Sequence, residues 1–319
     1  MRVMITGANG FVGRALVQRL LADGEIGGRR IAELLLLGRQ LTGFADDVRI
    51  RRLVGNLTDA SFLRRVLADG VDVVFHLVSV PGGAAEQNYE LGYQVNLQAS
   101  LELVDQLRTL PNMPVLVYAS SVAVYGANLP LQMDEDAELR PALSYGAHKV
   151  MMEVAISDLT RRGAVDGRVV RLPGIVARPR APNGLRSAFM SDLLHAFAAG
   201  EPYQCPVSPQ ASAWWMSLAC CVDNLVHAAS LDRAGLGGRC VWQLPVLQLS
   251  IASILDALAE RYGEPNRALI SFAPEADLEA LFGRFPALQT PIATAAGFRH
   301  DGDAAALIRR ALGGHSDAK

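Results

Sequence analysis

The chain contains almost no lysine. Of its 319 residues, 30 are lysine or arginine, and only Lys149 and Lys319 are lysines. Arginine therefore supplies nearly all of the positive charge, although a planar guanidinium does not replace an ammonium where a compact charge is required. A biased composition explains the scarcity of lysine but not the position of Lys149, so this residue is a candidate for a functional role.

Cysteine is also scarce and is not arranged for cross-linking or metal binding. None of the four cysteines forms a Cys-x-x-Cys pair, and two of them are adjacent. This pattern predicts neither a zinc site nor a disulfide framework, and it favours a reducing cytoplasm. The four are Cys205, Cys220, Cys221 and Cys240.

An excess of charge of either sign is missing. The 30 basic and 32 acidic residues give a formal net charge of −2, which argues against a protein that binds nucleic acid by neutralising phosphates. A chain that is 50% hydrophobic and 19% charged is expected to fold around a large core rather than to remain disordered.

No segment has the composition of a membrane span. The longest uncharged stretch, between Arg108 and Asp134, contains prolines and a glycine and is typical of a buried strand with loops. A strand-like run begins directly after Met1, so no signal peptide is expected before the fold. These observations predict a cytoplasmic protein with a small-molecule partner and no membrane or nucleic-acid partner.

Short apolar runs alternate with longer amphipathic ones through most of the chain. The apolar runs are typical of strands buried on both faces, and the amphipathic runs have helical spacing. This alternation predicts an α/β fold, a doubly wound parallel sheet of the Rossmann type. Strands are expected at residues 2–6, 33–37, 48–54, 71–77, 115–119, 168–172, 240–244 and 269–272, and helices at 11–22, 61–67, 89–110, 145–161, 186–199, 222–230 and 251–262.

The regular pattern loosens after about residue 174, where prolines divide the chain into loops. We therefore expect residues 1–173 to form a dinucleotide-binding domain, to which strands and helices near 218–246 return. A smaller, mostly C-terminal substrate domain is expected to comprise residues 174–217 and 247–319.

The first strand ends in a glycine-rich turn at the start of a helix. Glycines at such a turn let the backbone approach a pyrophosphate, which then lies at the positive end of the helix dipole. Because the turn joins a strand to a helix in an alternating array, it predicts a dinucleotide site. The expected contacts in this turn are Gly7, Asn9, Gly10, Phe11, Val12 and Gly13.

The end of the second strand bears on the choice between NAD and NADP. An acid there hydrogen-bonds the adenosine ribose of NAD, whereas an arginine accommodates the 2′-phosphate of NADP. The strand ends in Gly38 followed by Arg39, which favours NADP if Arg39 faces the cofactor and favours neither if it faces solvent. Further cofactor contacts are expected at Asn56, Leu57, Leu77, Val78, Ser79, Asn96, Pro173 and Ile175, whereas His76 is expected to be structural and Asp59 to cap a helix.

The most reactive side chains lie at the end of a central strand and at the start of a later helix. Ser121 follows the carboxyl end of the strand at residues 115–119, where doubly wound sheets bind their ligands. Tyr145 and Lys149 lie one turn apart on the helix. A tyrosine of pKa about 10 is a poor base at neutral pH, but a nearby ammonium lowers that pKa by stabilising the phenolate. The spacing therefore predicts a catalytic set of Ser121, Tyr145 and Lys149, with the one internal lysine in it.

These motifs resemble the extended short-chain dehydrogenase/reductase superfamily, over essentially the whole chain. The resemblance rests on the glycine turn, the Ser-Ser-x-x-x-Tyr-Gly segment at 120–126 and the Tyr-x-x-x-Lys pair. It implies that Tyr145 is the general base, that Ser121 binds the substrate hydroxyl and that Lys149 binds the nicotinamide ribose. Sugar dehydratases of the superfamily carry an Asp-Glu pair where this chain has Val122 and Ala123, so elimination of water is disfavoured.

Three segments, residues 76–86, 171–179 and 212–217, look closest to the D-erythronate dehydrogenase branch of the superfamily. The resemblance implies hydride transfer from the 2-hydroxyl carbon of a short sugar acid to NAD. That branch usually carries Asp where Gly38 stands, so the cofactor is expected to be NAD or NADP. Gly38 and Arg39 favour acceptance of NADP.

A sugar-acid substrate requires a cation for its carboxylate. Arg178 and Arg180 follow the strand that is expected to end beside the nicotinamide, and Arg178 is the better candidate. Of the adjacent Trp214 and Trp215, one is expected to belong to the core. The predicted substrate contacts are Ser79, Ser121, Tyr145, Arg178 and Trp215.

Two other functions remain open, and the motifs do not separate the first of them cleanly from a dehydrogenase. A nucleotide-sugar 4-epimerase would return the hydride to its substrate and give no net change in cofactor absorbance. A non-catalytic redox sensor would have no need of the Ser121, Tyr145 and Lys149 set.

The apolar positions of residues 99–110 and 150–159 further predict a homodimer, because superfamily members commonly pair through these two helices. The alternative is that the apolar stripes of both helices face the sheet.

Overall fold

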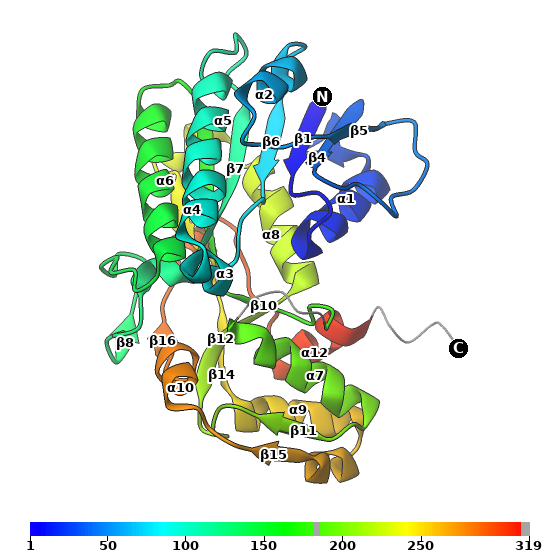
Figure 1. Cartoon of the computed structure of the whole chain (residues 1–319), viewed down its shortest axis with the longest axis vertical. Helices are drawn as coiled ribbons and strands as arrows, with labels where there is room; N and C mark the ends of the chain where they lie inside the picture. The colour runs from blue at the N-terminus through cyan, green and yellow to red at the C-terminus, as the bar shows by residue number, and fades with distance from the viewer. Residues whose placement is uncertain (181–185, 314–319) are drawn as a thin grey trace.

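A seven-stranded parallel sheet forms the larger lobe of the computed structural model, which describes residues 1–180 and 186–313 (Figure 1). The strand order is β13 (Val241–Gln243), β9 (Asp166–Leu172), β7 (Val115–Ser121), β6 (Val73–His76), β1 (Arg2–Thr6), β4 (Glu33–Gly38) and β5 (Ile50–Val54). The order reverses direction beside β1, which places the loops after β1 and β6 at the point where such sheets bind ligands. The predicted doubly wound Rossmann fold is confirmed.

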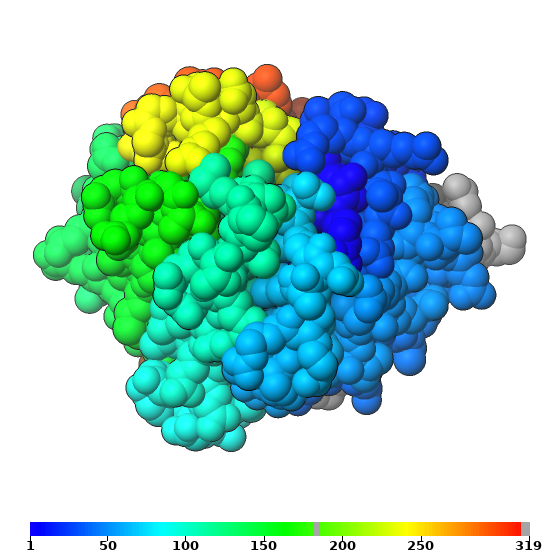
Figure 2. Space-filling view, turned by 90° about the horizontal axis from the view of Figure 1, so that it is seen from above, coloured from blue at the N-terminus to red at the C-terminus, as the bar shows by residue number. Residues whose placement is uncertain are grey.

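Helices cover both faces of this sheet. Successive residues of β1 point to opposite faces, so Val3 and Ile5 enter one core and Met4 enters the other. Helices α1 (Phe11–Asp23) and α8 (Leu218–Ser230) cover the first face, and α2 (Ala60–Leu67), α5 (Ala99–Leu107) and α6 (Ser144–Arg161) cover the second. In the view from above, blue, cyan, green and yellow segments meet at one end of this lobe, so distant parts of the sequence build one layered unit (Figure 2).

The smaller lobe lies beyond the carboxyl ends of the strands (Figure 1). Its mixed sheet has the order β10 (Gly174–Val176), β12 (Ser212–Ser217) and β14 (Leu247–Ser250), and a second pair joins β11 (Tyr203–Cys205) to β15 (Ile270–Phe272). A separate core of buried side chains lies between these strands and their helices. The helices are α7 (Phe189–Ala199), α9 (Ile251–Tyr262), α10 (Ala276–Phe282) and α12 (Ala304–Leu312).

The chain crosses between the lobes several times. It leaves the large sheet after β9, returns for α8 and β13, and leaves again for β14. Helix α11 (Pro291–Ala295) then returns, because Ala293 and Phe298 lie in the core under α1 and α8. The expected assignment of all of residues 247–319 to the small domain is therefore wrong for α11 and Phe298, whose apolar side chains complete the larger core. Residues 181–185 and 314–319 of the predicted small domain lie outside the described part.

Short elements connect the two lobes. Strand β8 (Gln132–Met133) pairs with β16 (Ala287–Leu288), and the buried Glu135 carboxylate accepts the backbone N–H groups of Ile292 and Ala293 at the start of α11. The remaining short elements are β2 (Glu25–Ile26), β3 (Arg29–Arg30), α3 (Gly82–Gln87), α4 (Tyr89–Gly92), η2 (Val122–Tyr125), η3 (Arg186–Ala188), η4 (Arg233–Leu236) and η5 (Glu264–Leu269). Within the described ranges, no helix has the length and hydrophobicity needed to traverse a bilayer.

One predicted helix is interrupted. The sequence predicts a continuous helix over residues 89–110, but α4 is followed by a π-helical turn, η1 (Tyr93–Gln98), before α5 begins. The interruption coincides with buried Asn96, whose side chain accepts a hydrogen bond from the Val80 N–H at 2.7 Å and donates one to the Val80 carbonyl at 3.0 Å. A π turn inside a helix often marks a functional site, and here it fixes the loop that follows β6.

Candidate active site

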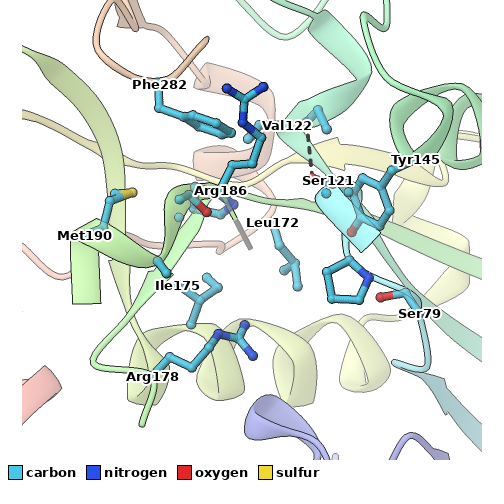
Figure 3. Close-up of a pocket in the computed structure, with 18 of the residues that line it drawn as sticks. Ser79, Ser121, Val122, Tyr145, Leu172, Ile175, Arg178, Arg186, Met190 and Phe282 are labelled. Carbon is cyan, nitrogen blue, oxygen red and sulfur yellow. Dashed lines mark hydrogen bonds between the residues drawn. The ribbon is translucent and has the colours of Figure 1, made fainter. Parts of the chain in front are cut away.

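A pocket of about 370 Å³ lies between the two lobes (Figure 3). Its wall combines the glycine turn, the end of β7, the start of α6, and residues of α7 and α10. Of the predicted site residues, the wall includes Gly7, Gly10, Phe11, Val12, Gly13, Leu77, Ser79, Ser121, Tyr145, Pro173, Ile175 and Arg178. The predicted residues that lie outside its lining are Asn9, Arg39, Asn56, Leu57, Val78, Asn96, Lys149 and Trp215.

The glycine turn leaves no room for side chains. Gly7 has φ +70°, and a Cβ there would lie 2.8 Å from the Val78 nitrogen; a Cβ on Gly13 would lie 2.2 Å from the Gly7 carbonyl oxygen. The backbone of the turn is thus packed closely against the loop after β6. The first turn of α1 lies in the pocket wall, and its first N–H groups have no partner within the helix. This cradle fits the pyrophosphate of a nicotinamide dinucleotide, which Gly10, Phe11 and Val12 would hold.

Ser121 and Tyr145 meet in the pocket. Ser121 Oγ accepts the Ala123 N–H at 3.1 Å, and Ser121 and Ser79 lie beside Tyr145 in the pocket wall (Figure 3). Burial raises the pKa of Tyr145, and the two serines and Arg178 act against that rise. The sequence predicts a lowered pKa for Tyr145; the pKa is instead raised, because desolvation of the phenolate is the dominant effect and Lys149 is not among the groups that oppose it.

Lys149 lies behind Tyr145 and is buried. Its ammonium donates to the Ala119 carbonyl at 2.6 Å and lies over the rings of Tyr118 and Tyr145, with Nζ 4.5 and 5.6 Å from the ring centroids. Burial lowers the pKa of Lys149 to about 7, although the negative charge of Glu153 acts in the opposite direction. The ammonium of the one internal lysine is therefore largely removed from water, and the Glu153 carboxylate is the negative charge that stabilises it.

That acid belongs to a buried ion pair that the sequence analysis did not identify. Glu153, one turn beyond Lys149 on α6, pairs with Arg171 of β9 at 2.7 Å and accepts a hydrogen bond from Ser120. Arg171 also donates to the Tyr125 hydroxyl at 2.9 Å. The spacing of Lys149 and Glu153 was visible in the sequence, but Arg171 comes from another strand, so only the fold brings the pair together.

His76 is structural, as the sequence indicates. Its Nδ1 is 2.8 Å from the Thr6 hydroxyl and its Nε2 is 2.9 Å from the Ser100 hydroxyl, so β1, β6 and α5 are joined through one imidazole. Burial lowers the pKa of His76 to about 3, and the ring is neutral at physiological pH. Asp59 likewise caps α2, because its carboxylate accepts the N–H groups of Ser61 and Phe62.

The two arginines of the predicted substrate region, Arg178 and Arg180, lie in different places. Arg178 lines the pocket and its guanidinium lies 4.7 Å from the centre of the Phe11 ring, whereas Arg180 is exposed and pairs with Glu201 at 2.5 Å. A further arginine, Arg186 of η3, also lines the pocket. No sequence motif points to Arg186, because it follows the proline-rich stretch in which the regular pattern is lost.

The prediction that Trp215 contacts the substrate is wrong, because Trp214 is the tryptophan in the pocket wall. Trp215 is fully buried in the core of the small lobe and donates from Nε1 to the Leu249 carbonyl at 3.0 Å. Trp214 instead belongs to the pocket wall and packs against Tyr125 and Phe285. Neighbouring residues of β12 point to opposite faces of the sheet, so only one of the two can reach the pocket.

The residues expected around the adenosine lie at the ends of β4 and β5. Arg39 is exposed, next to Gly38, and no hydrogen bond or ion pair joins its side chain to any described residue. The Asn56 side chain accepts the Thr58 N–H at 3.2 Å and so stabilises the local turn. Arg14 of α1 bonds to Asn9 and to the Thr42 carbonyl and stacks on Phe44, which fixes the loop after β4 beside the glycine turn.

Comparison with known proteins places this site in a family. The NAD dependent epimerase/dehydratase family matches residues 3–216, and the chain belongs to it. It is 38% identical over 314 residues to a D-erythronate dehydrogenase from Cupriavidus necator, covering 97% of each chain. It is 30% identical over 312 residues to a D-erythronate dehydrogenase from Haemophilus influenzae, covering 97% of this chain and 98% of that protein.

A solved structure agrees with this assignment. The nucleoside-diphosphate-sugar epimerase from Agrobacterium tumefaciens is 30% identical in sequence to this chain. The superposition covers 99% of this chain and 94% of that chain, with a TM-score of 0.90. The predicted membership of the extended short-chain superfamily is confirmed, and the protein is a dehydrogenase of that type with a nicotinamide cofactor.

Proposed function

We propose that the protein oxidises the 2-hydroxyl of a short sugar acid, D-erythronate or a close analogue, to the 2-oxo acid. The observation that carries the proposal is the position of Tyr145 beside Ser121 and Ser79 in the wall of the pocket (Figure 3). The activity of the two curated relatives supports the choice of substrate class. An epimerase would have the same catalytic residues but would return the hydride to its substrate.

The residues divide the work of alcohol oxidation. Tyr145 accepts the proton of the substrate hydroxyl, because its oxygen faces the pocket and two serine hydroxyls stabilise the phenolate that precedes transfer. Ser121 orients the same hydroxyl, and Ser79 supports it from the loop after β6. Lys149 places its charge behind the Tyr145 ring. A bound nicotinamide supplies the acceptor for the hydride that leaves the substrate carbon.

Absorbance at 340 nm tests the substrate class, since the reduced nicotinamide absorbs there. D-erythronate with either oxidised cofactor is expected to give a sustained rise in absorbance, and a nucleotide sugar is expected to give none. Conversion of a nucleotide sugar to its epimer without a change in absorbance would instead establish the epimerase.

We also propose that NADP is accepted at least as well as NAD. Gly38 presents no carboxylate to repel a 2′-phosphate, and the unpaired Arg39 beside it is able to provide a charge-assisted hydrogen bond. Gly38→Asp is expected to shift the kcat/KM ratio toward NAD by about ten- to a hundredfold, because it adds an acceptor and a repulsion. The nearest neighbours of a Cβ at position 38 would be the Leu41 side chain and the Gln40 carbonyl, at 3.2 and 3.3 Å, so the variant is expected to fold with a small shift of this loop. A wild-type enzyme that strongly prefers NAD would contradict the proposal.

We propose that the protein is a homodimer of the cytoplasm. Helices α5 and α6 lie side by side, and three apolar side chains on their outer faces remain exposed: Leu101 at 41%, Met151 at 45% and Val154 at 64% (Figure 1). Other apolar positions of these helices, such as Leu103 and Met152, face the sheet. The four unpaired, buried thiols suit a reducing compartment. Sedimentation at micromolar concentration tests the pairing, and a monomer would refute it.

A further inference from the structure

Two guanidinium groups line the pocket, and they lie at opposite ends of it. In Figure 3, Arg178 and Arg186 are separated by Leu172 and Ile175, with Ser121 and Tyr145 to one side. Asp192 is the acidic side chain in the wall, so the described lining carries more positive than negative charge. The reaction brings two anions into this space, the pyrophosphate of the cofactor and the carboxylate of the substrate.

Arg178 lies at the cofactor end. Its guanidinium stacks on Phe11, which follows directly on the glycine turn and begins α1. Its backbone is fixed from α7, because its N–H donates to Ser191 Oγ at 3.1 Å and its carbonyl accepts from His195 Nε2 at 2.9 Å. The residue before it, Ala177, has φ +61°, a left-handed conformation that costs free energy in a residue with a Cβ. The chain is thus held in an unfavourable backbone conformation that directs Arg178 toward the glycine turn.

Arg186 lies at the other end, on the substrate side of Ser121. It stands near Val122 and Phe282, at the far side of the pocket from Phe11 and Arg178 (Figure 3). Throughout residues 1–180 and 186–313, no side chain or carbonyl hydrogen-bonds or pairs with its guanidinium. A cation in a pocket wall without an internal counter-ion is available to an anionic ligand, and a guanidinium binds a carboxylate through two parallel hydrogen bonds.

We propose that Arg186 binds the carboxylate of the substrate acid, whereas Arg178 serves the pyrophosphate of the cofactor. The proposal rests on the proposed function and reassigns the role that the sequence had given to Arg178. Since the glycine turn fixes where the pyrophosphate lies, the arginine stacked on that turn is the one committed to the cofactor. The remaining cation, beyond Ser121, is left for the acid group next to the carbon that is oxidised.

Three variants test this division: Arg186→Gln, Arg178→Gln and, as a matched control, Arg180→Gln. Arg180 is exposed, pairs with Glu201 and does not line the pocket. Steady-state kinetics compare D-erythronate with its neutral amide, D-erythronamide, and fluorescence titration of the reduced cofactor gives its Kd without turnover.

Arg186→Gln is expected to raise KM for D-erythronate by about ten- to a hundredfold, the loss of one charge-assisted hydrogen-bond pair, with KM for the amide and the cofactor Kd within about twofold of wild type. Arg178→Gln is expected to raise the cofactor Kd by about tenfold and to keep the preference for acid over amide. Loss of that preference in Arg178→Gln, with an unaffected Arg186→Gln, would overturn the assignment.

A separate measurement distinguishes failure of this inference from failure of the substrate proposal. If the wild-type enzyme does not oxidise D-erythronate, the substrate proposal fails, and the same variants are titrated with oxamate and oxamide in the presence of reduced cofactor. A wild-type preference for the oxamate anion that disappears only in Arg186→Gln would still support the carboxylate site. A wild-type complex that prefers neither compound would overturn it.

Discussion

The two walls of the pocket are built in different ways. On the large-lobe side, Ser121, Tyr145 and Lys149 come from one strand and one long helix. Ser121 accepts the Ala123 N–H, and Lys149 donates to the Ala119 carbonyl of the neighbouring strand. On the small-lobe side, Arg186 and Phe282 come from short elements and are at least partly exposed. The first wall fixes the geometry of proton transfer, and the second is free to vary with the substrate.

Loss of the general base is expected to have the largest effect. Tyr145→Phe should lower kcat by about a hundred- to ten-thousandfold, because the variant lacks the hydroxyl that accepts the substrate proton. The cofactor Kd should remain near that of wild type. Tyr89→Phe is a matched control, since Tyr89 is exposed and lies outside the pocket lining. Wild-type turnover in Tyr145→Phe would show that the large-lobe wall does not perform the chemistry.

Lys149→Met is expected to separate activity from stability. Turnover should fall to a level similar to that of Tyr145→Phe, while the melting temperature rises by a few degrees, because a desolvated ammonium is replaced by an apolar side chain of similar length. Lys149→Arg should also be inactive, because a planar guanidinium does not fit the space of a compact ammonium. A destabilised Lys149→Met variant would show that the lysine supports the fold as well as the reaction.

The stability gain of Lys149→Met should depend on pH. Burial lowers the pKa of Lys149 to about 7, below its ordinary value of 10.5, so between these values the folded protein binds fewer protons than the unfolded chain. The free energy of unfolding of the wild type therefore rises with pH through this window. The advantage of the methionine variant should be greatest below pH 7 and should shrink toward pH 10, which thermal denaturation at several pH values measures.

A smaller effect is expected from the ion pair beneath the catalytic wall. Glu153→Gln leaves the buried Arg171 charge uncompensated and should cost about 3–5 kcal/mol of unfolding free energy in urea titrations. Asp158→Asn on the same helix breaks the exposed pair with Arg161 and should cost less than about 1 kcal/mol. Equal losses of unfolding free energy in the two variants would mean that the buried ion pair stabilises the fold no more than the exposed one.

The smallest effect is expected at Phe282 of the small-lobe wall. Phe282→Leu keeps an apolar side chain at the pocket, so it should change KM by only a few fold and leave kcat unchanged. Steady-state kinetics with D-erythronate measure both constants. A large fall in kcat would erase the contrast between the two walls, because it would place this phenylalanine among the groups that fix the reacting geometry.

The contrast between the two walls explains which parts of the fold and of the site could be predicted from the sequence. Ser121, Tyr145 and the glycine turn lie at strand ends and helix starts, where periodicity and short spacing are informative. Arg186 follows a stretch without periodicity, and the Glu153–Arg171 pair joins elements that only the fold brings together. The choice of Trp215 failed because the alternation of β12 does not reveal which face meets the pocket, and the pKa of Tyr145 depends on a degree of burial that no motif encodes.

The repeated crossing of the chain between the lobes limits how new specificities can arise. A segment cut after residue 173 would lack β13 and α8, so one edge of the sheet and much of one face would be bare. The substrate lobe is therefore not a module that recombination can exchange as a block, because its strands and those of the cofactor lobe alternate along one chain. Relatives of this protein can diversify instead by replacing side chains and short loops on the small-lobe wall, while the catalytic wall passes unchanged from one substrate to the next.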